Sequence, residues 1–128
     1  MKARLSLAIA LLAGCAIGAA AENTIGPKAK PPAYTIAEIE VIDPEGFQAF
    51  AKRNAAGVAA AGGLFLALPQ RGRILASEGT APKAVAMIAW DSLDEAAEYF
   101  NSPTFKELIP IRDKAARVRL FHVEGLPR

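Results

Sequence analysis

Four side chains of this 128-residue sequence could take part in chemistry: Glu78, Trp90, Arg112 and His122. His122 is the only histidine. Because an imidazole titrates near neutral pH, His122 is the natural candidate for a general acid or base, or for a haem ligand. A lone histidine without a paired Asp or Cys is more often a half-buried strand residue that hydrogen-bonds a neighbour. Catalysis by His122 is therefore a hypothesis, and the sequence leaves the reaction open.

Arg112 could bind a carboxylate or a phosphate through two parallel hydrogen bonds. It could also form an ion pair with Glu107, Asp113 or Glu78. We favour the structural ion pair, because charges on exposed helix faces usually contribute little.

Glu78 and Trp90 each have a functional and a structural interpretation. Glu78 could bring a carboxylate to the mouth of a barrel, but the Gly79 that follows more simply serves a turn with positive φ. Trp90 could stack on a planar ligand, although a buried core indole is the commoner role. We keep both residues, with Arg112 and His122, as candidates for ligand binding.

Other catalytic patterns are missing from the sequence. One histidine and one cysteine cannot make a cluster with metal-ligand spacing. No Ser/His/Asp order stands out, and no Gly-rich loop lies between a strand and a helix to hold phosphate. The sequence therefore predicts neither a metal site nor a cofactor.

Residues 1–21 have the pattern of a signal peptide. The Met1–Arg4 segment is basic, Leu5–Leu12 is apolar, and Ala19 and Ala21 occupy the small-residue positions before a cleavage site. The apolar run is shorter than the roughly 20 residues that a membrane-spanning helix needs. We expect a periplasmic or secreted protein after cleavage.

Cys15 offers an alternative processing route. The sequence Leu12-Ala13-Gly14-Cys15 resembles a bacterial lipobox, in which the cysteine sulfur is acylated. Cys15 could also be one more small apolar residue of the signal. Lipidation and simple cleavage both stay open, and lipidation at Cys15 is the only membrane attachment that we expect.

The rest of the chain divides into a flexible linker, residues 22–33, and one domain, residues 34–128. The full chain has 15 basic and 13 acidic residues, and loss of Lys2 and Arg4 with the signal leaves 13 of each. This balance gives no electrostatic argument for nucleic acid or for an anionic membrane as partner.

The domain alternates strand and helix patterns. Strands are expected at 34–41, 64–68, 84–90 and 118–123, with a further short one at 73–77. Helices are expected after Asp43-Pro44, Ser92 and Ser102-Pro103, because each position combines a capping side chain with a Pro or an acidic first turn. The order predicts an α+β fold with a ferredoxin-like βαββαβ subunit.

Both faces of the predicted sheet carry large apolar side chains, such as Met87 on one face and Ile88 on the other. A sheet with helices on one side only should leave its second face polar. We therefore expect a second copy to cover that face. Two such sheets packed face to face would form a homodimeric α/β barrel.

The sequence also resembles the family called domain of unknown function 1330 over about residues 34–127. The motifs that carry the resemblance are Gly62-Gly63, Glu78-Gly79 with Pro82, Trp90-Asp91-Ser92-Leu93, Asn101-Ser102-Pro103-Thr104-Phe105, Arg112 and Val123-Glu124-Gly125. The resemblance implies a ferredoxin-like subunit and dimeric α/β barrel assembly, and it brings no known activity. The chain departs from the family at Phe47, Phe50 and Phe105, where Tyr is frequent, at Arg71-Gly72, where Gly-Gly is frequent, and at Lys83, where Arg is frequent.

These observations predict an exported homodimer that binds a small apolar or aromatic molecule in its barrel or in the adjacent cleft. One alternative is a non-catalytic structural or stress-linked envelope protein whose core is filled by its own side chains. A further alternative, by analogy with the superfamily, is a cofactor-independent monooxygenase or isomerase.

Overall fold

The computed structural model describes residues 30–127. The predicted signal peptide, Cys15 and the linker up to residue 29 lie outside this range. The elements follow in the order β1 (Ala33–Val41), α2 (Pro44–Ala60), β2 (Leu64–Ala67), β3 (Ala84–Trp90), α3 (Leu93–Asn101), α4 (Pro103–Lys106), α5 (Ile109–Ala115) and β4 (Ala116–Glu124).

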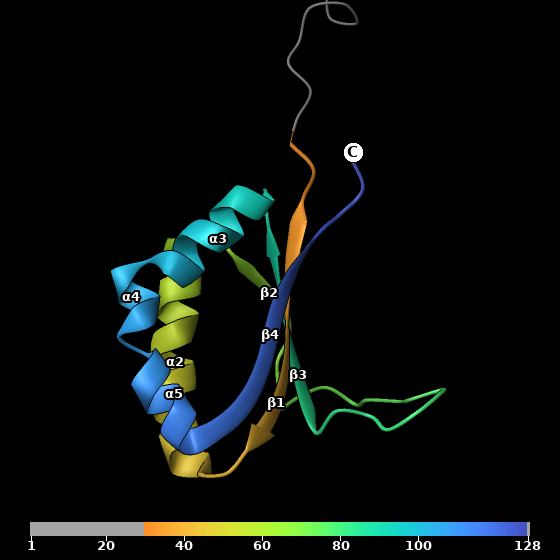
Figure 1. Cartoon of the computed structure of the whole chain (residues 1–128), viewed down its shortest axis with the longest axis vertical. Helices are drawn as coiled ribbons and strands as arrows, with labels where there is room; N and C mark the ends of the chain where they lie inside the picture. Colours follow the sequence, from red (N-terminus) through yellow and green to blue (C-terminus); the bar gives the residue numbers. More distant parts are fainter. Residues whose placement is uncertain (1–29, 128) are drawn as a thin grey trace, which may run out of the picture.

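The four strands form one antiparallel sheet in the order β2-β3-β1-β4. All the helices cover the same face of this sheet, so the domain has two layers (Figure 1). Central β1 pairs with β3 and with β4 along its length, with Thr35 opposite Ile88 on one side and opposite His122 on the other. This is the α+β, ferredoxin-like arrangement that the sequence predicts.

Local capping chemistry sets the helix boundaries in the second half of the domain. The Ser92 hydroxyl accepts a hydrogen bond from the Glu95 N–H at 3.2 Å and starts α3. Ser102 caps α4 by accepting from the Phe105 N–H at 3.3 Å. Pro110 then occupies the first turn of α5, which separates α4 from α5 because proline cannot continue the helix before it.

The core lies between the helices and the sheet face that they cover. Strand β1 turns alternate residues toward it, and Ala33, Thr35, Ala37 and Ile39 are all buried. Helix α2 contributes its buried stripe to this core: Phe47, Phe50 and Val58. Packing these residues removes apolar surface from water, which is the main favourable term in folding.

Strand β1 begins at Ala33, one residue before the domain boundary expected from the sequence. Ala33 is fully buried and pairs with Trp90 and Glu124. The Gly125 N–H donates to the Pro32 carbonyl at 2.7 Å, so the edge of the predicted linker is held by the sheet.

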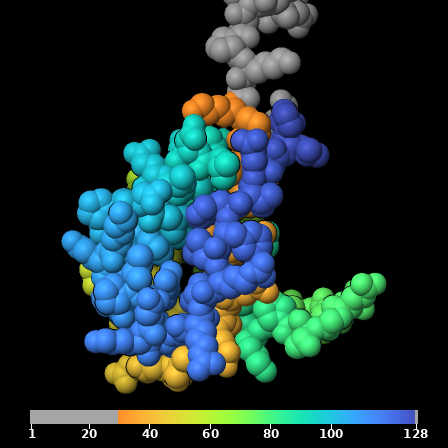
Figure 2. Space-filling model, viewed as in Figure 1, coloured from red at the N-terminus to blue at the C-terminus, as the bar shows by residue number. Residues whose placement is uncertain are grey.

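Residues 73–77, expected as a short strand, form no strand in the structure. They belong to a loop that joins β2 to β3, in which residues 70–80 are all exposed. The β2–β3 ladder ends at Ala67 opposite Met87 after an irregularity at Phe65–Ala67, so residues 73–77 have no neighbouring strand within the subunit. The loop projects away from the helices and stands clear of the body of the domain (Figures 1 and 2).

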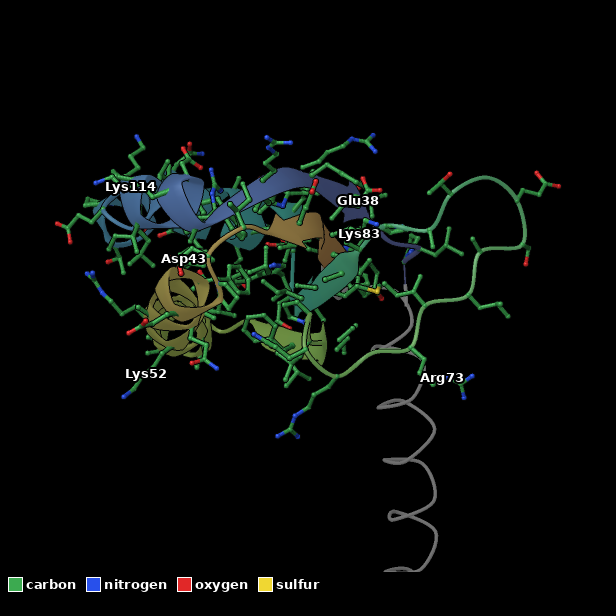
Figure 3. The ribbon with its side chains drawn as sticks, turned by 90° about the horizontal axis from the view of Figure 1, so that it is seen from below. Glu38, Asp43, Lys52, Arg73, Lys83 and Lys114 are labelled. Carbon is green, nitrogen blue, oxygen red and sulfur yellow. The ribbon has the colours of Figure 1, made fainter. Side chains whose placement is uncertain are left out.

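The second face of the sheet has no element of the described chain over it. This open face includes Leu64, Leu66, Phe121 and Val123, which are 65%, 52%, 39% and 45% exposed. Charged side chains gather at its lower end, where Glu38 and Lys83 line one shallow groove and Arg73 points away on the loop (Figure 3). Large apolar side chains exposed on an uncovered sheet face are typical of an interaction surface in soluble proteins.

Candidate functional site

A cavity of about 80 Å³ lies between the helices and the covered face of the sheet. Its walls come from β1, α2, the end of β2, β3, β4 and the three short helices. Five phenylalanines supply most of the aromatic surface: Phe47, Phe50, Phe65, Phe100 and Phe105. The polar side chains of the lining are Thr35, Asn54, Gln70 and Arg112. A mostly apolar wall with a few polar groups is the usual composition of a small-molecule site.

Arg112 is the only charged residue among those that line this cavity. Helix α5 carries it inward, and its side chain is only 17% exposed. The guanidinium carbon lies 5.8 Å from the centre of the Phe105 ring, which is a cation–π distance. Arg112 Nε and Nη2 lie 3.0 and 2.9 Å from Asp113 Oδ1, so the ion pair with Asp113 expected from the sequence is formed.

A chain of hydrogen bonds crosses three strands beside the cavity. Trp90 Nε1 on β3 donates to Thr35 Oγ1 on β1 at 2.8 Å. Thr35 Oγ1 lies 2.9 Å from His122 Nδ1 on β4. Trp90 and Thr35 are buried, so the hydroxyl gives the indole N–H an acceptor that water could not supply there.

His122 lies at the solvent-facing end of this chain. Burial lowers the pKa of His122 below its ordinary value of 6.5, because desolvation disfavours the charged imidazolium. The neutral ring packs against Phe100, with 4.9 Å between ring centres. His122 therefore contacts two residues of the cavity wall, Thr35 and Phe100, without lining the cavity itself.

Tyr99 and Asn54 join α3 to α2 at another part of the wall. The Tyr99 hydroxyl donates to Asn54 Oδ1 at 2.8 Å. Burial raises the pKa of Tyr99, so the phenol stays protonated and remains a donor. This bond fixes the orientation of the Asn54 amide, since its oxygen is occupied and its NH₂ is left as donor.

The four residues singled out from the sequence do not converge on one point. Arg112 lines the cavity, and His122 reaches it through Thr35. Trp90 is 2% exposed and lies in the core, stacked on Tyr99 with 5.7 Å between ring centres. Glu78 lies on the exposed β2–β3 loop, where Gly79 has the positive φ of 69° that its turn requires.

Sequence reasoning missed Thr35, Asn54 and Gln70. A signal was available for Thr35, which is the polar member of an otherwise apolar alternation with Ala33, Ala37 and Ile39. Asn54 and Gln70 carry no such signal, because only the packing of α2 and of the β2–β3 loop brings them to the cavity.

Residues 30–127 offer neither a cluster of metal ligands nor a membrane-spanning helix. No cluster of three or more His, Cys, Asp or Glu side chains in this range could hold a metal ion. No helix in the same range is long and apolar enough to cross a membrane.

Comparison with known sequences places the chain in a family. The sequence profile of the family described as "Domain of unknown function (DUF1330)" matches residues 32–126. The chain belongs to the DUF1330 family. No curated protein matches this DUF1330 chain.

Solved structures share the fold of this DUF1330 domain at low sequence identity. SnoaB, a cofactor-independent oxygenase from Streptomyces nogalater, is 16% identical with a TM-score of 0.55, over 77% of this chain and 96% of SnoaB. The RPA0582 protein of unknown function from Rhodopseudomonas palustris is 14% identical with a TM-score of 0.58, over 88% and 93%. A dimeric ferredoxin-like protein of unknown function from Thermobifida fusca is 13% identical with a TM-score of 0.52, over 74% and 92%. At these identities the likeness establishes the fold alone.

Proposed function

We propose that this DUF1330 domain binds a small apolar or aromatic molecule in the cavity between its helices and its sheet. The observation that carries the proposal is the cavity wall, in which five phenylalanines surround a few polar groups. A core filled by its own side chains would leave little space there, because protein interiors pack to crystal-like density.

The size of the cavity limits the ligand. An engineered apolar cavity of about 150 Å³ holds benzene, so the 80 Å³ here must widen to admit an aromatic ring. Leu68 and Gln70, which line one side, are exposed residues of the β2–β3 loop. Movement of this loop segment would supply the space without disturbing the sheet, since loops are the least constrained part of a domain.

Filling the cavity tests the proposal. Ala51 on α2 lines the cavity, whereas Ala59 on the same helix is exposed and does not. Ala51→Phe should abolish the binding of a small aromatic fragment, such as indole, in ligand-observed NMR, and Ala59→Phe should leave it unchanged. Equal binding by both variants would place the ligand elsewhere. No binding by the wild type, with no small molecule retained in native mass spectrometry, would favour the structural alternative.

We also propose that the domain functions as a homodimer through the open face. Leu64, Leu66, Phe121 and Val123 support this, because a second copy would remove their apolar side chains from water. The Thermobifida fusca neighbour is a dimeric ferredoxin-like protein, which supports the same assembly here.

A charge placed on the open face should separate the dimer. Phe121→Glu would place a charged carboxylate among the apolar side chains of this face, so we expect a monomer by size-exclusion chromatography with light scattering. Lys52→Glu, on α2 in the helix layer, is the matched control and should stay dimeric (Figure 3). A wild-type monomer, or a dimer that persists in Phe121→Glu, would refute this interface.

Export is a separate proposal, supported by the signal-like pattern of residues 1–21. We propose a periplasmic or secreted mature chain. Intact-mass measurement of protein from a periplasmic extract distinguishes the two processing routes. Cleavage after Ala21 gives residues 22–128, whereas a lipoprotein begins at an acylated Cys15. An unprocessed cytoplasmic chain would refute export.

One observation favours a second candidate function, a cofactor-independent oxygenase or isomerase. Thr35 lines the cavity and contacts His122, and a threonine hydroxyl can either donate a hydrogen bond or accept one. A proton could therefore pass between a bound molecule and the imidazole. SnoaB, which shares the fold, is a cofactor-independent oxygenase, and this supports testing for oxygenase chemistry. Substrate turnover that survives in His122→Gln would remove this candidate.

A further inference from the structure

The charged and polar side chains of the cavity wall indicate the chemical class of its ligand. Arg112 is cationic, and no Asp or Glu is among the residues that form the wall. Asn54 and Gln70 are the other side chains there with N–H donors. The polar part of the wall is therefore rich in donors and positive in charge.

Arg112 keeps part of its donor set free. A guanidinium has five N–H donors in a planar fork. Within residues 30–127, the only side-chain oxygen engaged with them is Asp113 Oδ1, which faces Nε and Nη2. Asp113 itself is 59% exposed, so its carboxylate remains hydrated beside the ion pair. The donors on Nη1 and the second donor on Nη2 stay available for another acceptor.

Asn54, on helix α2, adds a second donor to the same cavity. Its amide oxygen accepts from the Tyr99 hydroxyl at 2.8 Å, and its NH₂ group remains as a donor that Asn54 can offer to the cavity. Asn54 comes from α2 and Arg112 from α5, two helices that pack against each other. The same cavity thus receives a cationic donor and a neutral donor from separate elements.

We infer that the ligand is an apolar or aromatic monocarboxylate, with its carboxylate on Arg112 and Asn54 and its body among the phenylalanines. This inference rests on the proposed function, because it assigns a chemical class to the same cavity. A carboxylate matches the guanidinium fork in geometry and charge, which offsets the loss of its hydration. A neutral acceptor would pair with the Arg112 donors more weakly than a carboxylate does, and a cationic head group would be repelled by the guanidinium.

Matched acid and amide probes test the inference. Phenylacetate and phenylacetamide share shape and differ in charge, as do benzoate and benzamide. We expect wild-type protein to bind each acid about tenfold or more tightly than its amide in calorimetry, as charge-assisted hydrogen bonds predict. Arg112→Gln should bring the acid-to-amide ratio close to one. Arg53→Gln, which makes the same charge change at an exposed position of α2 away from the cavity wall, should keep the wild-type ratio.

A variant of Asp113 provides an independent test, because it should raise the affinity for the acid probes where Arg112→Gln lowers it. Because Asp113 competes for the guanidinium, Asp113→Asn should tighten acid binding severalfold and leave amide binding unchanged. Equal affinity of acid and amide in the wild type would overturn the carboxylate inference and leave the proposed function standing. Binding of neither probe class would overturn both.

Discussion

The hydrogen-bond chain from Trp90 through Thr35 to His122 makes a measurable prediction about stability. Thr35→Val keeps the branched shape of the side chain and removes the hydroxyl. The Trp90 N–H, in a residue only 2% exposed, then loses its acceptor, which costs about 1–3 kcal/mol. The partly exposed His122 ring can turn to water instead, so we assign it no penalty.

The added methyl group offsets part of this cost. Burying one more carbon contributes roughly 0.8 kcal/mol. The expected net loss is therefore about 0.2–2 kcal/mol in the free energy of unfolding. In a domain of this size each kcal/mol lowers Tm by about 4–8 °C.

Urea denaturation, at one protein concentration for all variants, measures this loss. Trp90 is the only tryptophan, so its fluorescence reports directly on the altered site. Thr35→Ser is the matched control, because it keeps the acceptor and loses only a methyl group. A double-mutant cycle with Trp90→Phe, followed by circular dichroism, isolates the Thr35–Trp90 coupling. A Thr35→Val variant as stable as the wild type would refute the assigned role of the hydroxyl.

Three further predictions follow from other contacts. Because the pKa of His122 is lowered in the folded protein, the unfolded chain takes up a proton first on acidification, and stability should fall as the pH drops below about 6.5. Urea melts at pH 7.5 and 5.5 measure this loss of stability, which should be smaller in His122→Gln. An identical loss in the wild type and in His122→Gln would contradict the assignment. Gly57→Ala would place its Cβ 2.6 Å from the Tyr99 hydroxyl oxygen, so it should destabilise the domain although alanine favours helices by about 1 kcal/mol. Thermal melts should show partial recovery in the Tyr99→Phe background, and a more stable Gly57→Ala would refute the clash. Ser92→Ala should lower the free energy of unfolding by about 1 kcal/mol through loss of the α3 cap. Ser92→Thr keeps a capping hydroxyl and should retain most of the wild-type stability in the same assay.

Element order was predictable because local chemistry determines it. Ser92, Ser102, Pro103 and Pro110 each act on the backbone within one turn, so their effects can be inferred without knowing the fold. The sheet face toward which each strand residue points likewise follows from the alternation of side chains along the strand. The expected strand at 73–77 failed because a strand also needs a neighbour, and the β2–β3 ladder ends at Ala67.

The candidate site was only partly predictable, because it depends on contacts between distant segments. Arg112 could be identified from its charge and position, but its burial beside Phe105 depends on the packing of α5 against α2. The Thr35–His122 contact joins residues 87 positions apart. Glu78 is exposed because the β2–β3 loop projects from the domain (Figure 1). The local sequence around Glu78 does not predict this projection.

The two ends of the described chain leave the domain at the same end of the sheet (Figure 1). Ala33 pairs with Glu124 there, and the Gly125 N–H bonds the Pro32 carbonyl. The cavity wall, in contrast, begins at Thr35 and runs along β1 to Ile39, toward the other end of that strand. A dye, a surface linker or a fusion partner attached to either terminus should leave the binding cavity uncovered. A circular permutant that joins the old termini and opens the exposed β2–β3 loop should also fold, which makes the domain suitable for engineering into a small-molecule sensor.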